Sequence, residues 1–190
     1  MELSRALFVA LVAAVAALRF VELRISRRNQ RRLAERGATR APDPRFPAMV
    51  AVHTCVLAGA AAEVVFLERP FYPLLASVMG ALFLAANALR WWVIHTLGAH
   101  WNVQVMDSAR LGVVTSGPYR WVRHPNYSAV FVEMLSLPLI HTAWITALAG
   151  TVAHLWVLRG RVAAEEKVLL AEPGYRAAMA AKPRFVPFLF

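Results

Sequence analysis

A polar, aromatic stretch, TSGPYRWVRHPNYSAV at residues 115–130, stands between two strongly apolar segments. Pro118 and Pro125 fix their own φ angles near −65°, and each biases the preceding residue toward an extended conformation. Gly117 permits a tight turn or a close approach of the backbone to a ligand. We therefore expect a rigid turn whose exposed main-chain groups lie beside aromatic rings, which suits an adenine ring. The rings are those of Tyr119, Trp121 and Tyr127. The alternative is an interfacial belt, because Trp and Tyr favour the lipid headgroup region.

A second group of charges follows about 35 residues later, in RGRVAAEEKVLL. Arg161 and Glu165 are four residues apart, so on a helix they would share one face with His154, and Glu166 would lie beside that face. An ordinary surface ion pair is one interpretation. However, Arg161 lies only a few residues beyond an apolar run, where an arginine needs an anionic ligand or a carboxylate partner.

Glu133 is a carboxylate inside an apolar segment, where such a group is costly and usually faces the interior of a helical bundle. Three roles are open to it: a direct part in catalysis, a pairing with Arg90 or His154, or a neutral hydrogen-bonded acid. We expect His53, Glu63 and His154 to serve in packing or hydrogen bonding rather than as ligands.

Metal chemistry is not indicated by the sequence. No two of the six histidines form a tight ligand pair, and no HExxH motif occurs. The single cysteine, Cys55, falls in an apolar segment, so neither an intramolecular disulfide nor a cysteine-based metal site can form. We expect no metal.

The hydropathy of the chain is that of a membrane protein, because 59% of its 190 residues are hydrophobic and the mean hydropathy is +0.50. Five apolar segments are candidate helices: 6–18 (extendable to 23), 46–67, 74–94, 127–140 and 142–158. The fourth is too short to cross upright, so it would tilt or form a hairpin with the fifth. We count four or five spans and favour five. The predicted fold is an all-α integral membrane bundle, a single domain over residues 1–190.

Arginines predict the orientation of the bundle. Eight of them lie between residues 24 and 45, and most of the others lie in 95–126 and 159–190. The positive-inside rule then puts the N-terminus outside and the C-terminus in the cytoplasm, which requires an odd number of spans. The net charge of +10 is explained in the same way, by contact with anionic membrane lipids, so we expect no nucleic-acid partner. The first apolar segment has no clear cleavage site and is interpreted as a retained anchor.

Three polar connections would lie on the cytoplasmic side: 24–45, 95–126 and 159–190. The first is predicted to be a helix that stops at Gly37, followed by a proline-marked loop. A site between membrane and cytoplasm would be built from the other two connections. The chain would thus divide into N-terminal helices with a basic loop, 1–75, and a core, 76–190.

The sequence LGVVTSGPYRWVRHPNY, followed by RGRVAAEE, resembles the isoprenylcysteine carboxyl methyltransferase family. The family pattern is GPY, three residues and RHPxY before a helical hairpin, then an arginine and a Glu-Glu pair on the emerging helix. The resemblance covers roughly residues 80–188 and leaves the first 75 unmatched.

This resemblance implies a membrane fold that binds S-adenosylmethionine on the cytoplasmic side, in a pocket closed to water, with the lipid acceptor entering laterally from the membrane. The implied cofactor-binding residues are Gln104, Gly117, Tyr119, His124, Pro125, Tyr127 and Glu165. The implied catalytic pair is Arg161 and Glu166, and we add Glu133 as a candidate proton acceptor. Arg161 would hold an anionic acceptor, and Glu166 would fix that arginine or hold the donor.

The predicted function is therefore O-methylation of a lipophilic acceptor, either an isoprenylcysteine-like carboxylate or the hydroxyl of a polyketide-derived lipid. The second acceptor is considered because Glu133 and the run LPLIHTAWITA resemble bacterial relatives, and because the Ala- and Arg-rich composition is typical of a bacterial cell membrane protein. Two alternatives are N-methylation of a phospholipid amine and a non-enzymatic role in membrane transport or assembly.

Overall fold

The computed structural model describes residues 2–185 and is built almost entirely from helices. Helix α1, Glu2–Glu35, joins the first apolar segment and the arginine-rich stretch without a break. Neither glycine nor proline occurs within it, so nothing in its sequence interrupts the helix. The helix ends just before Gly37, whose φ of +82° is the left-handed conformation that glycine adopts readily, so the predicted stop is confirmed.

Two further long helices follow, α2 at Phe46–Phe66 and α3 at Pro73–Leu97. Both have a proline in the first turn, where the missing N–H costs no hydrogen bond. Their bounds match the second and third predicted segments closely. Two short strands link the first and second polar connections. Strand β1, Thr39–Arg40, pairs antiparallel with β2, Met106–Asp107.

The C-terminal half contains the predicted helical hairpin. Helix α4, Pro125–Leu139, and helix α5, Trp144–Leu169, pack against each other. Helix α5 continues past its apolar run as a polar helix, as predicted, and is followed by α6, Pro173–Met179. Single 3-10 turns occupy 98–100, 109–111 and 117–120.

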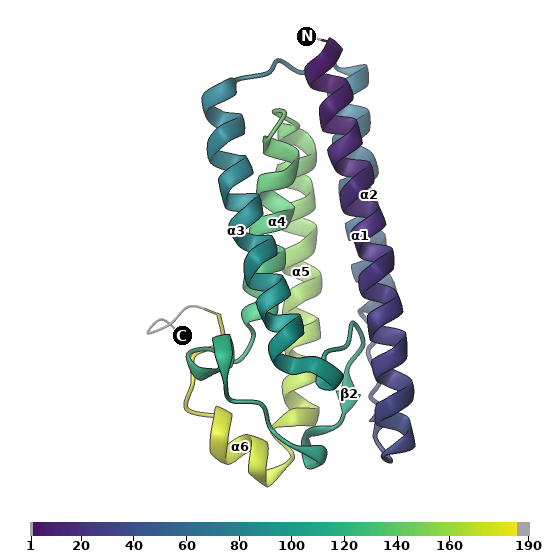
Figure 1. Ribbon diagram of the computed structural model, residues 1–190, viewed down its shortest axis with the longest axis vertical. Helices are drawn as coiled ribbons and strands as arrows, with labels where there is room; N and C mark the ends of the chain where they lie inside the picture. Colours follow the sequence, from purple (N-terminus) through teal and green to yellow (C-terminus); the bar gives the residue numbers. More distant parts are fainter. Residues whose placement is uncertain (1, 186–190) are drawn as a thin grey trace.

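The five long helices of the described chain run roughly along one axis (Figure 1). Helix α4 packs against both α3 and α5, while α2 packs against α5 and α1. The arginine-rich end of α1, the connection that contains β2, and α6 all lie at the end of the bundle opposite the N-terminus (Figure 1). The three polar connections predicted from the sequence are therefore gathered at one end.

Three stretches of residues 2–185 are long and apolar enough to cross a membrane: α1, α2 and Pro73–His100. Large apolar side chains such as Leu7, Leu84 and Trp156 are exposed on the outside of the bundle, as expected of a surface that faces lipid. Helix α4 has only 15 residues, and the apolar run of α5 ends at Arg159 and Arg161. Five spans thus remain a prediction for these two helices.

Candidate active site at the polar end of the bundle

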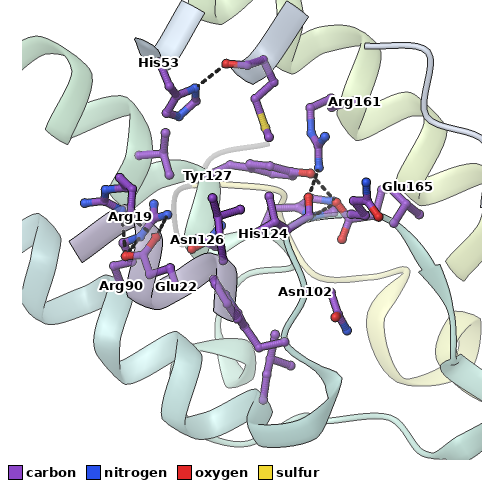
Figure 2. Close-up of a pocket in the computed structure, with 18 of the residues that line it drawn as sticks. Arg19, Glu22, His53, Arg90, Asn102, His124, Asn126, Tyr127, Arg161 and Glu165 are labelled. Carbon is purple, nitrogen blue, oxygen red and sulfur yellow. Dashed lines mark hydrogen bonds and ion pairs between the residues drawn. The ribbon is translucent and has the colours of Figure 1, made fainter. Parts of the chain in front are cut away.

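A cavity of about 760 Å³ extends from the 115–130 turn into the bundle. Helices α1 and α2 contribute mostly aliphatic and alanine side chains to its wall, and the polar side chains come largely from the connections, α4 and α5 (Figure 2). This volume is typical of small-molecule sites, and the combination of an apolar wall with a few convergent polar groups is the usual composition of such a site.

The C-terminal segment holds the turn in place. The main-chain N–H groups of Arg123 and His124 donate to the carbonyl oxygens of Pro183 and Arg184, both at 2.9 Å. Lys182 Nζ donates to the carbonyl oxygen of Tyr119 at 2.7 Å. These bonds join segments some 60 residues apart, so the turn is rigid because a second strand of chain is bonded to it. No pattern in the sequence indicates this contact.

The connection after α3 is held by α1. Asn29 donates through Nδ2 to the carbonyl oxygens of Gly98 and Trp101, at 2.9 and 2.8 Å. The hydroxyl of Ser26 accepts a bond from the main-chain N–H of Val103 at 3.0 Å. Both α1 side chains are buried. The polar stretch of α1, which showed no usable family resemblance, therefore positions the part of the cavity wall that contains Gln104.

His124 lies between the two glutamates of the emerging helix. Its Nε2 is 3.1 Å from Glu166 Oε1, and its Nδ1 is 3.9 Å from Glu165 Oε2. The hydroxyl of Tyr127 donates to Glu165 Oε2 at 2.6 Å. The RHPxY turn and the Glu-Glu pair thus meet in the structure. His124, Tyr127 and Glu165 line the cavity, as does Tyr119 of the same turn.

Glu166 points away from Arg161, so the predicted pairing of these two residues is not formed. Its carboxylate bonds His124 and also pairs with Arg123 at 3.1 Å and Arg184 at 2.7 Å. The hydrogen bond from His124, followed by the two arginines, lowers the pKa of Glu166 to about 2. In the described chain Glu166 does not line the cavity, and its hydrogen bond holds His124 in position.

The partner of Arg161 is Asp43, in the loop between α1 and α2. Arg161 Nη1 lies 2.5 Å from Asp43 Oδ2, and Nη2 donates to the carbonyl oxygen of Val103 at 2.9 Å. Both charged side chains are almost fully buried, with 5% and 1% of their surface exposed. The expectation that Arg161 needs an anionic partner is confirmed, but the partner comes from the N-terminal third of the chain. The available signal was an acid between two prolines, PDP, in an otherwise basic connection.

Gly117 and Pro125 shape the turn from outside the cavity wall of the described residues. Gly117 has a φ of +55°, and a Cβ placed there would come within 2.5 Å of Thr96 Oγ1 and 3.2 Å of Trp92 Nε1. The close approach of the backbone is therefore to α3 rather than to the cavity. Pro125 is buried and forms the first residue of α4.

Burial, and then the nearby Glu165 carboxylate, raise the pKa of Tyr119 well above its ordinary value, so its phenol is neutral.

Glu133 belongs to a largely buried ionic cluster with Arg19, Glu22 and Arg90, and Figure 2 shows the last three of these residues. It lies 3.4 Å from both Arg19 and Arg90, and these two arginines pair with Glu22 at 2.8 and 2.6 Å. The considered pairing with Arg90 is confirmed. The cluster joins α1, α3 and α4, whereas a catalytic part for Glu133 stays a prediction. The sequence did not single out Arg19 or Glu22.

The buried polar atoms of the wall suit S-adenosylmethionine. Asn102 Oδ1, Asn126 Oδ1 and Arg161 Nε are buried without a hydrogen-bond partner among residues 2–185, and all three residues line the cavity. The rings of Tyr119, Tyr127 and Tyr175 provide flat apolar surfaces there. Glu165 has no arginine or lysine partner within the described chain, so its carboxylate is available to a cation. Residues 2–185 hold no group of three side chains that could bind a metal ion.

These features define a helical membrane protein with an internal cavity. One end of the cavity is polar, and the rest of its wall is largely apolar. The family model for the isoprenylcysteine carboxyl methyltransferase (ICMT) family matches residues 78–171, and the chain belongs to that family. The fold is similar to a solved structure of the eukaryotic intramembrane Ras methyltransferase ICMT, with a TM-score of 0.60 and 24% identity. That match covers 75% of this chain and 53% of the other, so the chain spans about half the length of the eukaryotic protein.

Two bacterial relatives match over most of their length. An uncharacterized protein of Bacillus subtilis, YpbQ, is 28% identical over 163 residues, covering 86% of this chain and 96% of its own. An uncharacterized protein of Haemophilus influenzae is 28% identical over 159 residues, covering 83% and 91%. The similarity to these two proteins therefore extends into the N-terminal helices, where the sequence motifs gave no resemblance.

Proposed function

We propose that the protein is a membrane methyltransferase that moves a methyl group from S-adenosylmethionine to an oxygen atom of a lipophilic acceptor. The observation that carries the proposal is that one cavity has two kinds of wall. The RHPxY turn, Glu165 and Arg161 form one part of this wall, and apolar residues of α1 and α2 form another. Membership of the ICMT family supports the reaction type.

Different residues at the polar end of the cavity bind different parts of the methyl donor. Tyr119, Tyr127 and Tyr175 offer ring faces to the adenine, and Glu165 offers its carboxylate to the cationic part of the donor. When bound, S-adenosylmethionine supplies an electrophilic methyl group attached to a positively charged sulfur. His124, fixed by Glu166 and by the C-terminal segment, keeps Tyr127 and Glu165 in place.

Arg161 is suited to orient the acceptor, because its guanidinium is fixed at two points by Asp43 and Val103 and its Nε has no partner among residues 2–185. The apolar wall keeps water away from the reacting atoms. Methyl transfer to oxygen gains from that exclusion and from alignment of the two reactants, since the positive charge on the sulfur of the donor disappears as the reaction proceeds.

N-methylation of a phospholipid amine is the second candidate. A free arginine charge in the site would repel a cationic headgroup, but the pairing of Arg161 with Asp43 removes that objection. Comparing an amine with oxygen acceptors of equal chain length decides between the two.

The membrane arrangement that we propose has five spans, with the N-terminus outside and the C-terminus in the cytoplasm of a bacterial cell. Figure 1 supports this arrangement, because the arginine-rich end of α1, helix α6 and the 115–130 turn lie toward one end of the bundle. The donor would then enter from the cytoplasm and the acceptor from the lipid phase.

Calorimetry of S-adenosylmethionine binding to the detergent-purified protein tests the proposal. We expect His124→Ala and Tyr127→Ala to weaken binding at least about tenfold, or about 1.4 kcal/mol. His95→Gln is the matched control, because His95 is an exposed histidine of α3 away from the cavity wall. Equal affinity in folded variants, or no binding by the wild type, contradicts the proposal.

A further inference from the structure

Two histidines line the cavity beyond Arg161, one on α2 and one on α5. The rings of His53 and His154 are 5.6 Å apart and meet edge to face, at 81°. His154 precedes Arg161 by seven residues on α5, which places it about 10 Å deeper in the bundle at 1.5 Å per residue. His53, Tyr127 and Arg161 surround the same space in Figure 2. The pair thus lies between the polar end and the apolar wall.

A main-chain carbonyl fixes the tautomer of His53. Its Nδ1 lies 2.8 Å from the carbonyl oxygen of Met49, which can only accept a hydrogen bond. Nδ1 therefore carries the proton, and Nε2 of the neutral imidazole carries a lone pair. The same bond fixes the orientation of the ring. His53 consequently offers a basic nitrogen in a defined position, which is how a histidine is prepared to act as a proton acceptor.

His154 is a buried polar side chain that lacks a partner. Only 3% of its surface is exposed, and neither ring nitrogen has a hydrogen-bond partner among residues 2–185. Buried polar groups are almost always hydrogen-bonded, so an unpartnered one on a cavity wall indicates a ligand group. A neutral imidazole provides one donor and one acceptor, and a hydroxyl group matches both.

The charges of the wall favour a neutral ligand at this pair. Four arginines of the described chain line the cavity, and each has a carboxylate partner within 3.1 Å. They are Arg19, Arg90, Arg123 and Arg161. Arg123 shares Glu166 with Arg184, whereas Arg19, Arg90 and Arg161 are matched by Glu22, Glu133 and Asp43. None of these three arginines is left to balance a carboxylate acceptor at the histidine pair, and a buried charge without a partner is strongly unfavourable.

We propose that His53 and His154 form the acceptor subsite, and that the acceptor is a neutral hydroxyl group on a lipophilic molecule; this inference rests on the proposed methyltransferase function. His154 binds the hydroxyl oxygen through its N–H, and His53 Nε2 accepts the hydroxyl proton. The oxygen forms its bond to the methyl carbon while the carbon–sulfur bond breaks, and sulfur keeps that electron pair. Once the methylated product has left the cavity, the protonated His53 loses its proton to water. The alkyl part of the acceptor lies against α1 and α2, where Val12, Ala13 and Leu57 line the cavity.

An acceptor panel tests the class of substrate. Purified protein in lipid vesicles is given methyl-labelled S-adenosylmethionine and one of three probes with the same decyl chain: a 4-alkylphenol, a carboxylic acid or a primary amine. We expect label to appear in the phenol alone. Preferred transfer to the acid or the amine, or to none of the three by a protein that binds the donor, overturns this inference. A protein that does not bind the donor contradicts the proposed function itself.

Two substitutions test the roles of the histidines. His53→Asn keeps a side-chain N–H close to the Met49 carbonyl but removes the basic nitrogen. We expect it to slow transfer to the alkylphenol by at least about 100-fold, the usual contribution of a general base. For a nitro-substituted phenol that is already ionised at the assay pH, we expect a loss below about tenfold. His95→Gln should change neither rate.

His154→Phe keeps a flat aromatic ring, although a slightly larger one, and removes both unpartnered nitrogens. We expect the thermal unfolding midpoint to stay equal or rise while transfer to the alkylphenol falls at least about tenfold, with donor affinity unchanged. Equal losses on both phenols for His53→Asn, or full activity in either variant, overturns the assignment.

Discussion

The ion pair between Asp43 and Arg161 gives the sharpest prediction about stability. Arg161 is buried, so removing its partner leaves a guanidinium without charge compensation. Breaking a buried pair in this way costs about 3–5 kcal/mol. Asp43→Asn retains an oxygen that can still accept from Nη1, and the bond to the Val103 carbonyl stays in place. We therefore expect a loss at the low end of that range, about 3 kcal/mol of unfolding free energy.

Reversible denaturant titration in mixed micelles measures this loss, within a double-mutant cycle of Asp43→Asn and Arg161→Gln. We expect a coupling of about 2–3 kcal/mol between the two substitutions. Glu68→Gln is the chemically matched control, because Glu68 pairs with Arg5 at 3.5 Å but is 73% exposed, and such pairs contribute about 0–1 kcal/mol. A coupling below about 0.5 kcal/mol, or equal losses for Asp43→Asn and Glu68→Gln, would refute the reasoning.

Three further predictions concern the turn, the glutamate pair and the basic loop. Gly117→Ala should lower the thermal unfolding midpoint, because an alanine in the left-handed conformation costs about 1–2 kcal/mol and its Cβ meets Thr96. Adding Thr96→Ala should recover only the part of the loss that comes from the contact with Thr96. Full stability of Gly117→Ala alone would contradict this prediction. Since the hydrogen bond from His124 lowers the folded-state pKa of Glu166 from 4.5 to about 2, its stabilisation is complete above pH 4.5 and is lost as pH falls toward 2. Unfolding free energy followed over that range should depend less steeply on pH in Glu166→Gln, and identical slopes would refute the assignment. In a cysteine-free background, a cysteine introduced into 24–45 should resist an impermeant thiol reagent in intact cells, and rapid labelling would reverse the proposed topology.

Much of the architecture follows from local patterns. The long helices coincide with apolar runs, and prolines or glycines mark their ends, as at Pro73 and Gly37. The hairpin of α4 and α5 was one of two expected arrangements, because the fourth apolar segment is too short to cross a membrane upright. These features depend on neighbouring residues, which is why a single sequence predicts them.

The partner of Arg161 could not be predicted in this way. The sequence suggested Glu166, but residues five apart on a helix point about 140° apart at 3.6 residues per turn, so the two side chains face different neighbours. Asp43 is 118 residues away in the chain and reaches Arg161 only after α2 and α5 have packed together. Such a pairing depends on tertiary contacts that no local spacing encodes.

The two histidines show the same limit. From sequence, His53 and His154 are isolated polar residues in apolar segments, and packing roles were the natural expectation. The absence of a partner for His154 within residues 2–185, and the carbonyl that fixes the His53 tautomer, are visible only once α2 and α5 lie side by side.

Transfer of a labelled methyl group to lipid is the most direct test of the central claim. Purified protein in vesicles that contain extracted bacterial lipid is incubated with methyl-labelled S-adenosylmethionine, and label is counted in the organic phase. We expect label to accumulate in a lipid product with wild-type protein and His95→Gln, and to fall at least about tenfold with Tyr127→Ala. Label that stays at the level of heat-denatured protein for every lipid fraction would contradict the assignment as a membrane methyltransferase.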